Sequence, residues 1–449
     1  MRPIVTEANH GTGSDLADSA QSPSYPKSTY DVLRSAQLIP LPEPRRTPLP
    51  FEAELVISEQ SAQLLRIYQT GIGTWMDILD HSLTYQRQVV RCALSSGLLL
   101  YSICALSAKQ MSLVGEQSLW EPVAARYYGE SLTLLIQGLN QPQTSHGIVL
   151  TATIVLCSYE LLANPGPDYK RHLYGAHTLI QTRGVVAQGT ALERASFWVY
   201  ARQDVALAII NESTTLISPQ EWRAALPDLG AEEDAMGNKM LWLLARVIEL
   251  RFTPTENMWP ETRSQGFRDV STELDQWWDD LPSLARGVPI GESTHDELNE
   301  VLFYVPSAAA GVLYYHMARI LCLEYSVKSS VVNAAENSVN NQYHKSTLQD
   351  ELRSHGQSIA SICFSRGLPD GVLPVAVNPL FYGKSNPQRH SRGFNMLTEP
   401  AARYISSLPL KARIWAFLDN IEAKLGYYTR SRVTQLQREL QPELTTANE

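Results

Sequence analysis

Three strongly polar residues, Arg202, Gln203 and Asp204, interrupt the otherwise apolar stretch "ASFWVYARQDVALAII" at 195–210. If this stretch is a helix, Trp198 begins one apolar stripe, and other apolar residues cover its remaining sides. A helix that is apolar all round is normally surrounded by protein. We therefore expect Arg202, Gln203, Asp204 and Trp198 to belong to a buried polar core.

Two roles fit charges in such a position. Arg202 and Asp204 lie about 200° apart around a helix axis, so they cannot pair with each other, and each is expected to need a partner from another helix. Leaving a buried charge unpaired is strongly destabilising. The structural interpretation is a polar lock between helices, and the functional alternative is a site for an acidic or polar effector.

Paired aspartates offer a different kind of chemistry. The sequence "DQWWDDLP" contains Asp279 and Asp280, and all-helical enzymes of the terpene synthase type bind magnesium diphosphate through paired aspartates. That motif carries a further acid where Ser283 or Leu284 stands here, and 211–218 lacks the final acid of a second metal-binding segment. Because magnesium needs several convergent oxygen ligands, we expect the two aspartates to end a helix on its solvated side. A terpenoid-type enzyme using magnesium is kept as the alternative function.

Two weaker patterns point to cofactors without the required context. "GIGTWM" at 71–76 lacks the third glycine of a dinucleotide-binding loop and sits within a helical stripe, not after a strand. His172 and His177 are five residues apart, about 140° around a helix, whereas zinc-binding helices space histidines by four. The sequence therefore predicts no catalytic residue, no cofactor and no metal ligand.

Composition limits the possible partners. The 449 residues are 44% apolar, enough for a large core, and carry a net charge of −9. Proteins that bind nucleic acid unaided are usually basic in at least one block, and the densest candidate here is Arg45–Arg46. We expect no direct binding to DNA or to an anionic membrane. The five cysteines are widely spaced without a C-x-x-C pair, which indicates buried free thiols in a reducing compartment.

Helical periodicity runs through most of the chain and predicts an all-α fold, a large domain of packed antiparallel helices with no significant sheet. Residues 1–51, rich in Ser, Pro and Thr, predict a disordered arm, 52–442 the helical domain, and 443–449 a disordered tail. The polar stretch 326–347 is the best candidate for a long mobile loop. Gly426 is placed to terminate the last helix.

Three uncharged stretches, 92–108, 147–159 and 301–318, approach the length of a membrane span. A span needs about 20 predominantly apolar residues. The first stretch is diluted by serines, and the third contains Pro306. We expect all three to be buried helices of a soluble domain. The N-terminus has no apolar core of a secretory signal.

Several segments follow one another in a recognisable order. They are "LLRIYQTGIGTWMDILD", "LLLYSICALSAKQMS", "ARYYGESLTLL", "TIVLCSYELL", "RHLYGAHTLIQTRG", the block "ASFWVYARQDVALAI" with Arg202-Gln203-Asp204, "ELDQWWDDLP", "NPLFYGKS" and "RIWAFLDNIEAKLGYYT". Together, over roughly residues 60–430, they resemble the fungal-specific transcription factor domain. This is the regulatory domain of fungal binuclear zinc-cluster transcription factors.

The resemblance implies a nuclear regulator of a metabolic or biosynthetic gene set. It implies protein partners, either a DNA-binding transcription factor or a second copy of the chain, and a small-molecule effector is compatible with it. The family's DNA-binding module has six cysteines near the N-terminus, whereas the first cysteine here is Cys92. We therefore expect this polypeptide to reach DNA only indirectly. An interaction scaffold without a transcriptional role is a further alternative.

Overall fold

The computed structural model describes residues 55, 57–141, 144–162, 167–184, 189–226, 233–290, 298–333, 339–380 and 407–429. These ranges are mainly helical, which confirms the predicted all-α fold class. The longer helices are α2 (Glu59–Thr70), α3 (Ile72–Met76), α5 (Gly97–Val114), α6 (Gln117–Asn140), α7 (His146–Leu162), α8 (Pro167–Arg183), α10 (Ala191–Asn211), α12 (Glu233–Phe252), α13 (Pro260–Asp280), α14 (Pro306–Asn333), α15 (Val339–Phe364), α16 (Leu373–Leu380) and α17 (Leu408–Leu425).

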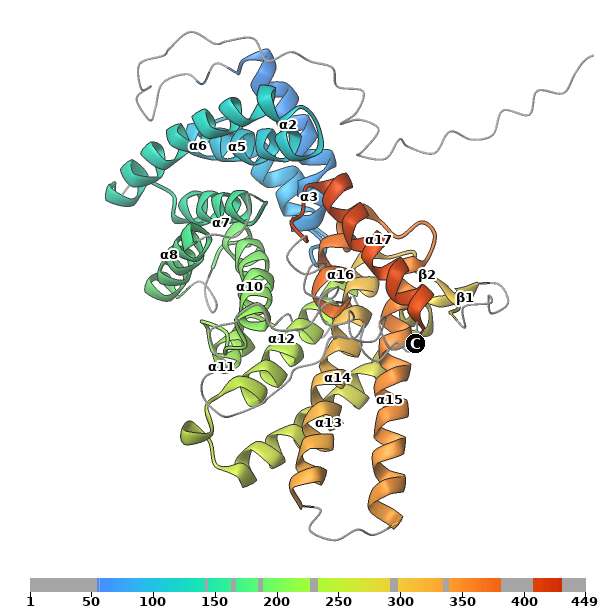
Figure 1. The fold of residues 1–449 in the computed structure, drawn as a ribbon. Helices are drawn as coiled ribbons and strands as arrows, with labels where there is room; N and C mark the ends of the chain where they lie inside the picture. The colour runs from blue at the N-terminus through green and yellow to red at the C-terminus, as the bar shows by residue number, and fades with distance from the viewer. Residues whose placement is uncertain are drawn as a thin grey trace, which may run out of the picture.

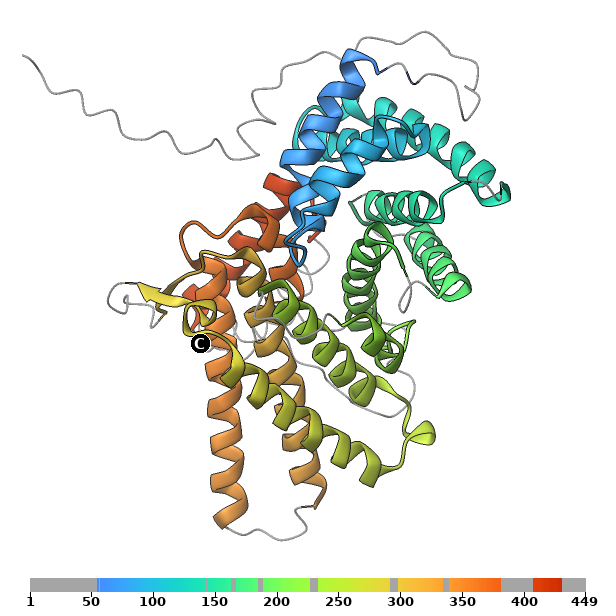
Figure 2. The ribbon, with the colours of Figure 1, turned by 180° about the vertical axis from the view of Figure 1, so that it is seen from behind.

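The helices follow a curved path that returns to its start (Figures 1 and 2). Helices α2, α5 and α6 form one end, α7, α8 and α10 continue along one side, and α12 to α15 form the opposite end. Helices α16 and α17 then bring the chain back to α3 and α5. Gln110 of α5 donates through Nε2 to the main-chain carbonyl of Leu425, at the end of α17, over 3.1 Å. An early helix, α5, and the last described helix, α17, are therefore held together directly.

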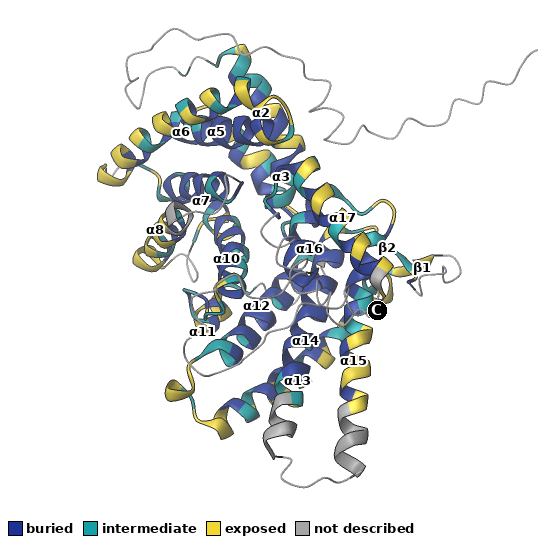
Figure 3. Ribbon diagram, in the orientation of Figure 1, coloured by how far each residue is buried: buried dark blue, intermediate teal, exposed yellow. Residues whose placement is uncertain are grey.

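The core is continuous along this path, and α5 and α7 are among its most deeply buried helices (Figure 3). Both are apolar on nearly every side, as a helix surrounded by protein must be. Within the described part of the chain, α5 is the one helix long and apolar enough to cross a membrane. Of its residues, 78% are buried inside the protein, which is also typical of a central helix in a folded domain. All five thiols are free, and Cys92 alone among them is only half-buried.

Helix ends follow local sequence signals, with one break that periodicity concealed. Gly426 ends α17 in the left-handed conformation at φ 70°, as predicted. The helical stripe that contains "GIGTWM" consists of apolar residues at helix spacing from Leu64 to Leu79. It is not a single helix, because α2 ends at Thr70 and α3 begins at Ile72. Gly71, between them, donates its N–H to the Ile67 carbonyl over 2.9 Å and turns the chain. The apolar stripe stays buried across this break.

The prediction of a long loop over 326–347 is wrong for most of that stretch. Helix α14 continues to Asn333 and α15 begins at Val339, so helix covers 326–333 and 339–347. Ser and Asn disfavour a helix by only fractions of a kcal/mol per residue, and helices anchored by buried turns extend through them.

The chain also forms a short hairpin, β1 (Val288–Ile290) antiparallel to β2 (Glu300–Leu302), which no alternation had indicated. Within the stretch 301–318, helix α14 begins at Pro306, a residue suited to a first turn. The predicted arm at 1–51 and tail at 443–449 lie outside the described residues, and the domain boundaries stay predictions.

Candidate functional site

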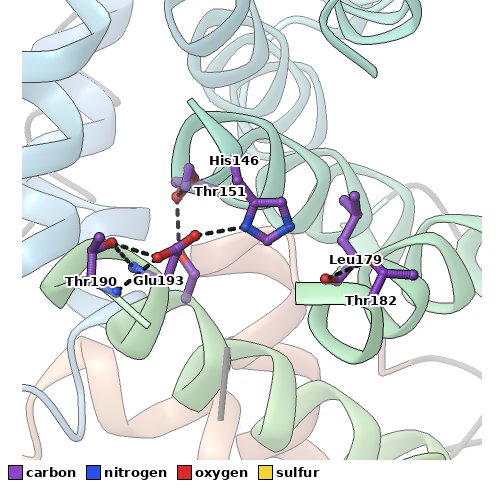
Figure 4. A network of polar contacts seen from close by, with 8 residues as sticks. His146, Thr151, Leu179, Thr182, Thr190 and Glu193 are labelled. Carbon is purple, nitrogen blue, oxygen red and sulfur yellow. Dashed lines mark hydrogen bonds and ion pairs between the residues drawn. The ribbon is translucent and has the colours of Figure 1, made fainter. Parts of the chain in front are cut away.

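The N-terminal end of α10 is fixed by a polar network with α7 (Figure 4). The Thr190 side chain accepts from the backbone N–H of Glu193, whose carboxylate accepts from the Thr190 N–H over 2.8 Å, a capping box. The same carboxylate contacts Nδ1 of His146 at 2.6 Å. Burial acts to raise the pKa of Glu193, but the hydrogen bonds from Thr190 and His146 outweigh it and leave that pKa lowered. The position of α10 along its own axis is thereby set.

Asp204 lies on α10 with 1% of its surface exposed and is satisfied by main-chain donors. Its two carboxylate oxygens each accept from the Leu216 N–H over 2.9 Å, and one also accepts from the Ile217 N–H over 3.2 Å. The Tyr200 hydroxyl donates to the same carboxylate over 3.3 Å. Burial raises the pKa of Asp204 to about 6, while these hydrogen bonds act to lower it.

Arg202 lies on another side of the same helix and holds the end of α3. Its guanidinium donates through Nη1 to the Trp75 carbonyl over 2.7 Å and through Nη2 to the Met76 carbonyl. Both acceptors are neutral, and the described residues place no carboxylate within ion-pair distance of the guanidinium. Burial lowers the pKa of Arg202, against smaller opposing effects of Tyr314 and Asp77.

These contacts correct the expectation that Arg202 and Asp204 would each find a partner on another helix. Arg202 does so, at the main chain of α3. Asp204 does not, because its partners are the loop that follows α10 and Tyr200 within α10. A loop that returns beneath its own helix brings backbone N–H groups to a buried carboxylate, and no side-chain pattern signals such a return.

The two remaining predicted core residues lie beside this pair. Gln203 is buried, and its Nε2 donates to the Ser158 hydroxyl of α7 over 2.8 Å. Trp198 is half-buried, with its ring edge-to-face with Phe197 at a centroid distance of 5.3 Å. The structure therefore brings Arg202 and Gln203 together along one side of α10, and it turns Asp204 to another.

A pocket of about 110 Å³ lies against the Arg202 and Gln203 side of α10. Its walls come from α3, α5, α7, α14, α16 and the turn before α16, and from the residues just after α17. The sequence pattern singles out Arg202 and Gln203 but gives no role to four further polar lining residues, Ser158, Tyr314, Asn378 and Tyr427. These four are separated by long stretches of chain, so only the closure of the helical path could place them together.

Two side-chain atoms of residues that line this pocket, the Nε of Arg202 and the Oε1 of Gln203, have no hydrogen-bond partner among the described residues. Buried polar groups are nearly always satisfied, and exceptions call for an explanation. Both residues line the pocket, so its wall contains one cationic and one amide side chain whose hydrogen-bonding capacity is not filled. Because most of its other lining residues are apolar, the pocket has the composition typical of a small-molecule site.

The other sequence candidates stand apart from the pocket. Asp279 and Asp280 are exposed at the end of α13, and among the described residues no group of three or more His, Cys, Asp or Glu is placed to hold a metal ion. His172 contacts the Tyr128 hydroxyl over 2.9 Å, and His177, also on α8, is half-buried. "GIGTWM" forms the junction of α2 and α3, not a strand-to-helix loop.

One histidine pair was not predicted from the sequence. His316 of α14 and His355 of α15 place their Nδ1 atoms 2.8 Å apart. Burial holds the pKa of His316 well below its usual value, with further lowering by His355 and Arg319. Burial also lowers the pKa of His355 to about 4. The pair is thus neutral at pH 7 and joins two long helices. The residues are 39 positions apart, so spacing gave no sign of their contact.

Comparison with known proteins gives one family match over residues 63–365, more than half of the chain, to the model described as fungal specific transcription factor domain. The transcription activator AMTR1 of Alternaria alternata is 21% identical over 472 aligned positions, covering 76% of this chain and 61% of that protein. The chain thus spans about three fifths of the length of this curated relative. No solved structure matches the chain.

Proposed function

Because the chain belongs to the fungal-specific transcription factor domain family, we propose that it regulates transcription in the nucleus of a fungal cell. The observation that carries this proposal is the family match over 63–365, which runs from within α2 to the end of α15. The similarity to a transcription activator favours activation over repression. Its targets, in this proposal, are the genes of one metabolic or biosynthetic process.

DNA recognition, in this proposal, depends on a further protein segment or on a partner that binds DNA. The 449 residues carry a net charge of −9, and their first cysteine is Cys92, so they contain no six-cysteine cluster that would hold two zinc ions. A negatively charged body is repelled by DNA phosphates at long range. The helical surface would instead contact another transcription factor or a second copy of the chain.

The helical body would act as a regulatory platform with fixed geometry. Helices α5 and α17 are joined at Gln110 and Leu425, and α10 is held at both ends, by Glu193 at its start and through Asp204 near its finish. Such a closed body can present one surface reproducibly to a partner. It can also transmit a change made at its centre to surfaces formed by distant parts of the sequence.

A tethering experiment tests the proposal on a defined operator, so the natural promoter need not be identified. The full chain is fused to the DNA-binding domain of a bacterial repressor, and a reporter with the matching operator is measured in a fungal host. We expect reporter expression to rise at least several-fold above that of the DNA-binding domain alone. Reporter output equal to that control, with the fusion present in the nucleus by microscopy and immunoblot, would contradict the proposal.

The gene set is approached separately. Deleting the gene that encodes the chain should change transcripts of a limited group of enzymes, measured by RNA sequencing against the parent strain. Complementation with the intact chain should restore them. A transcriptome indistinguishable from that of the parent, under conditions where the protein is made, would contradict a role in gene regulation.

A further inference from the structure

The pocket beside α10 combines three features that together point to a ligand. It is walled by segments from the beginning, middle and end of the described chain, represented by Met76 of α3, Val199 of α10 and Val375 of α16. It contains buried polar atoms without partners. Several of its lining residues, including Leu161 and Ala206, are only half-buried, so the pocket is accessible from the surface.

Gln203 supplies the first recognition group. The residue is 9% exposed, its Nε2 is committed to the Ser158 hydroxyl, and its Oε1 has no partner within the part of the chain that the structure describes. The Ser158 hydroxyl in turn donates to the Ile154 carbonyl over 3.0 Å, so this contact fixes which end of the amide faces Ser158. A buried amide oxygen held in this way is an acceptor for a ligand hydroxyl or N–H group.

Arg202 supplies the second group. Nη1 and Nη2 are committed to the carbonyls of Trp75 and Met76, and these fix the plane of the guanidinium. None of the described residues accepts a hydrogen bond from the Nε–H, and the two carbonyls carry no net charge to balance the cation. An acceptor that is itself negative satisfies both needs at once, because hydrogen bonds between ionised groups are the stronger ones.

The remaining walls and the volume set the size and polarity of the ligand. Met76, Leu106, Leu162 and Val375 line the pocket with apolar surface. A cavity of about 150 Å³ holds benzene, and this pocket is about 110 Å³ and open to the surface. An aliphatic body of a few carbons fits inside, and an aromatic ring or a larger body fits with part of it extending through the open side of the pocket.

We propose that this pocket binds a small organic acid with a mainly apolar body, its carboxylate on Arg202 and a hydroxyl or N–H group on Gln203. We further infer that this binding regulates the domain, a step that rests on the proposed transcriptional function. A ligand here contacts α3, α10 and α16 together and stabilises the closed arrangement over any open one.

Binding is tested first on the purified full chain, independently of transcription. The probes are benzoate, phenylacetate, 4-hydroxyphenylacetate and indole-3-acetate, each paired with its neutral amide and titrated by calorimetry. We expect at least one acid to bind with a Kd below about 10 mM and at least tenfold more tightly than its amide. The acid-to-amide ratio isolates the contribution of the guanidinium.

Variants locate the site. Ala206→Phe fills the outer part of the pocket, and Gln203→Leu removes the acceptor while keeping the side-chain size; each should weaken the acid at least tenfold. The matched control, Ala191→Phe, adds the same ring at an exposed position in the first turn of α10 and should leave affinity unchanged. Circular dichroism verifies that all three variants are folded. Binding of no acid below about 10 mM, or binding that Ala206→Phe leaves unchanged, would overturn the proposed site.

The tethered reporter then separates the site from its regulatory role. Ala206→Phe should change reporter output at least threefold relative to Ala191→Phe. If the acids bind but both variants give wild-type output, the ligand site stands and regulation through it is refuted. If the wild-type fusion is silent while calorimetry still shows acid binding, the transcriptional proposal fails and the binding site does not.

Discussion

Asp204 and Arg202 lie two residues apart on α10 and both lack a counter-ion among the described residues, yet their surroundings differ. Asp204 faces the loop that follows α10, where backbone N–H groups of Leu216 and Ile217 and the Tyr200 hydroxyl occupy its carboxylate. Arg202 lines a pocket, and its Nε has no hydrogen-bond partner in the described ranges. One charge is enclosed by the protein's own main chain, and the other is left able to bind something more.

The comparison shows how one helix can serve both stability and recognition. A buried charge whose hydrogen-bonding capacity is filled contributes to the fold and offers nothing to a ligand. A charged side chain can instead keep an unused donor beside an accessible cavity. The unsatisfied donor raises the free energy of the empty protein, and a ligand that accepts from it relieves this cost. On this reasoning Asp204 serves the fold alone, whereas Arg202 holds the end of α3 and is also available, with Gln203, for recognition.

The largest expected effect is at Asp204. Asp204→Ala removes the acceptor of the half-buried Leu216 and the buried Ile217 N–H groups, and we expect the free energy of unfolding to fall by about 3–4 kcal/mol. Chemical denaturation monitored by circular dichroism measures the change, with Asp280→Ala, at the exposed end of α13, as the control. Equal stability of the two variants would remove the structural role assigned to Asp204.

The pH dependence of Asp204 gives the next effect. Its pKa is raised from 3.8 to about 6 in the folded protein, so its contribution to stability is fully present below pH 3.8 and is lost as the pH rises through 6. Between pH 4 and pH 7 the wild type should therefore lose about 2–3 kcal/mol more than Asp204→Asn, which cannot ionise. Urea unfolding at a series of pH values tests this. Parallel curves for the two proteins would mean that burial does not raise this pKa.

A smaller effect is expected at Gln203. Gln203→Leu removes an amide whose oxygen is already unpartnered, and Ser158 keeps its bond to Ile154, so stability should change by less than about 1 kcal/mol. Gln110→Leu is the matched variant, because it frees the Leu425 carbonyl that joins α5 to α17, and it should be the more destabilising of the two. If denaturation shows that Gln203→Leu loses more unfolding free energy than Gln110→Leu, then Gln203 on the pocket side of α10 has a structural role.

The smallest effect is expected at the paired aspartates. Asp279→Asn and Asp280→Asn change exposed side chains at the end of α13, so stability should shift by no more than about 0.5 kcal/mol. Magnesium should not raise the melting temperature of wild type or variants. A magnesium-dependent rise that both substitutions abolish would revive the terpenoid-type alternative.

Local signals were sufficient for much of the fold. The apolar surroundings of 195–210 predicted a buried helix, and Gly426 marked a helix end because its left-handed backbone favours glycine. The polar composition of 326–347 led to the wrong prediction of a long loop there. Tertiary packing continues α14 and α15 through residues of modest helix propensity. The break at Gly71 was missed because the apolar stripe stays buried across it.

The candidate site was predictable only in part. The sequence identified Arg202, Gln203 and Asp204 as unusual but could not assign their partners, since the acceptors of Arg202 and most donors to Asp204 are backbone atoms. Backbone groups are the same in every sequence, so no residue pattern marks them. The pocket depends on the chain returning to its start, which a single sequence does not encode as a local pattern.

Hydrogen exchange measured by mass spectrometry on Asp204→Ala and Arg202→Lys compares the two sides of α10 in one experiment. The lysine keeps the positive charge. It lacks the planar guanidinium that donates to the Trp75 and Met76 carbonyls at the same time. We predict that Asp204→Ala speeds exchange in peptides covering 213–218 and leaves 72–79 unchanged, while Arg202→Lys does the opposite. Equal loosening of both segments by both variants would contradict the separation of roles along α10.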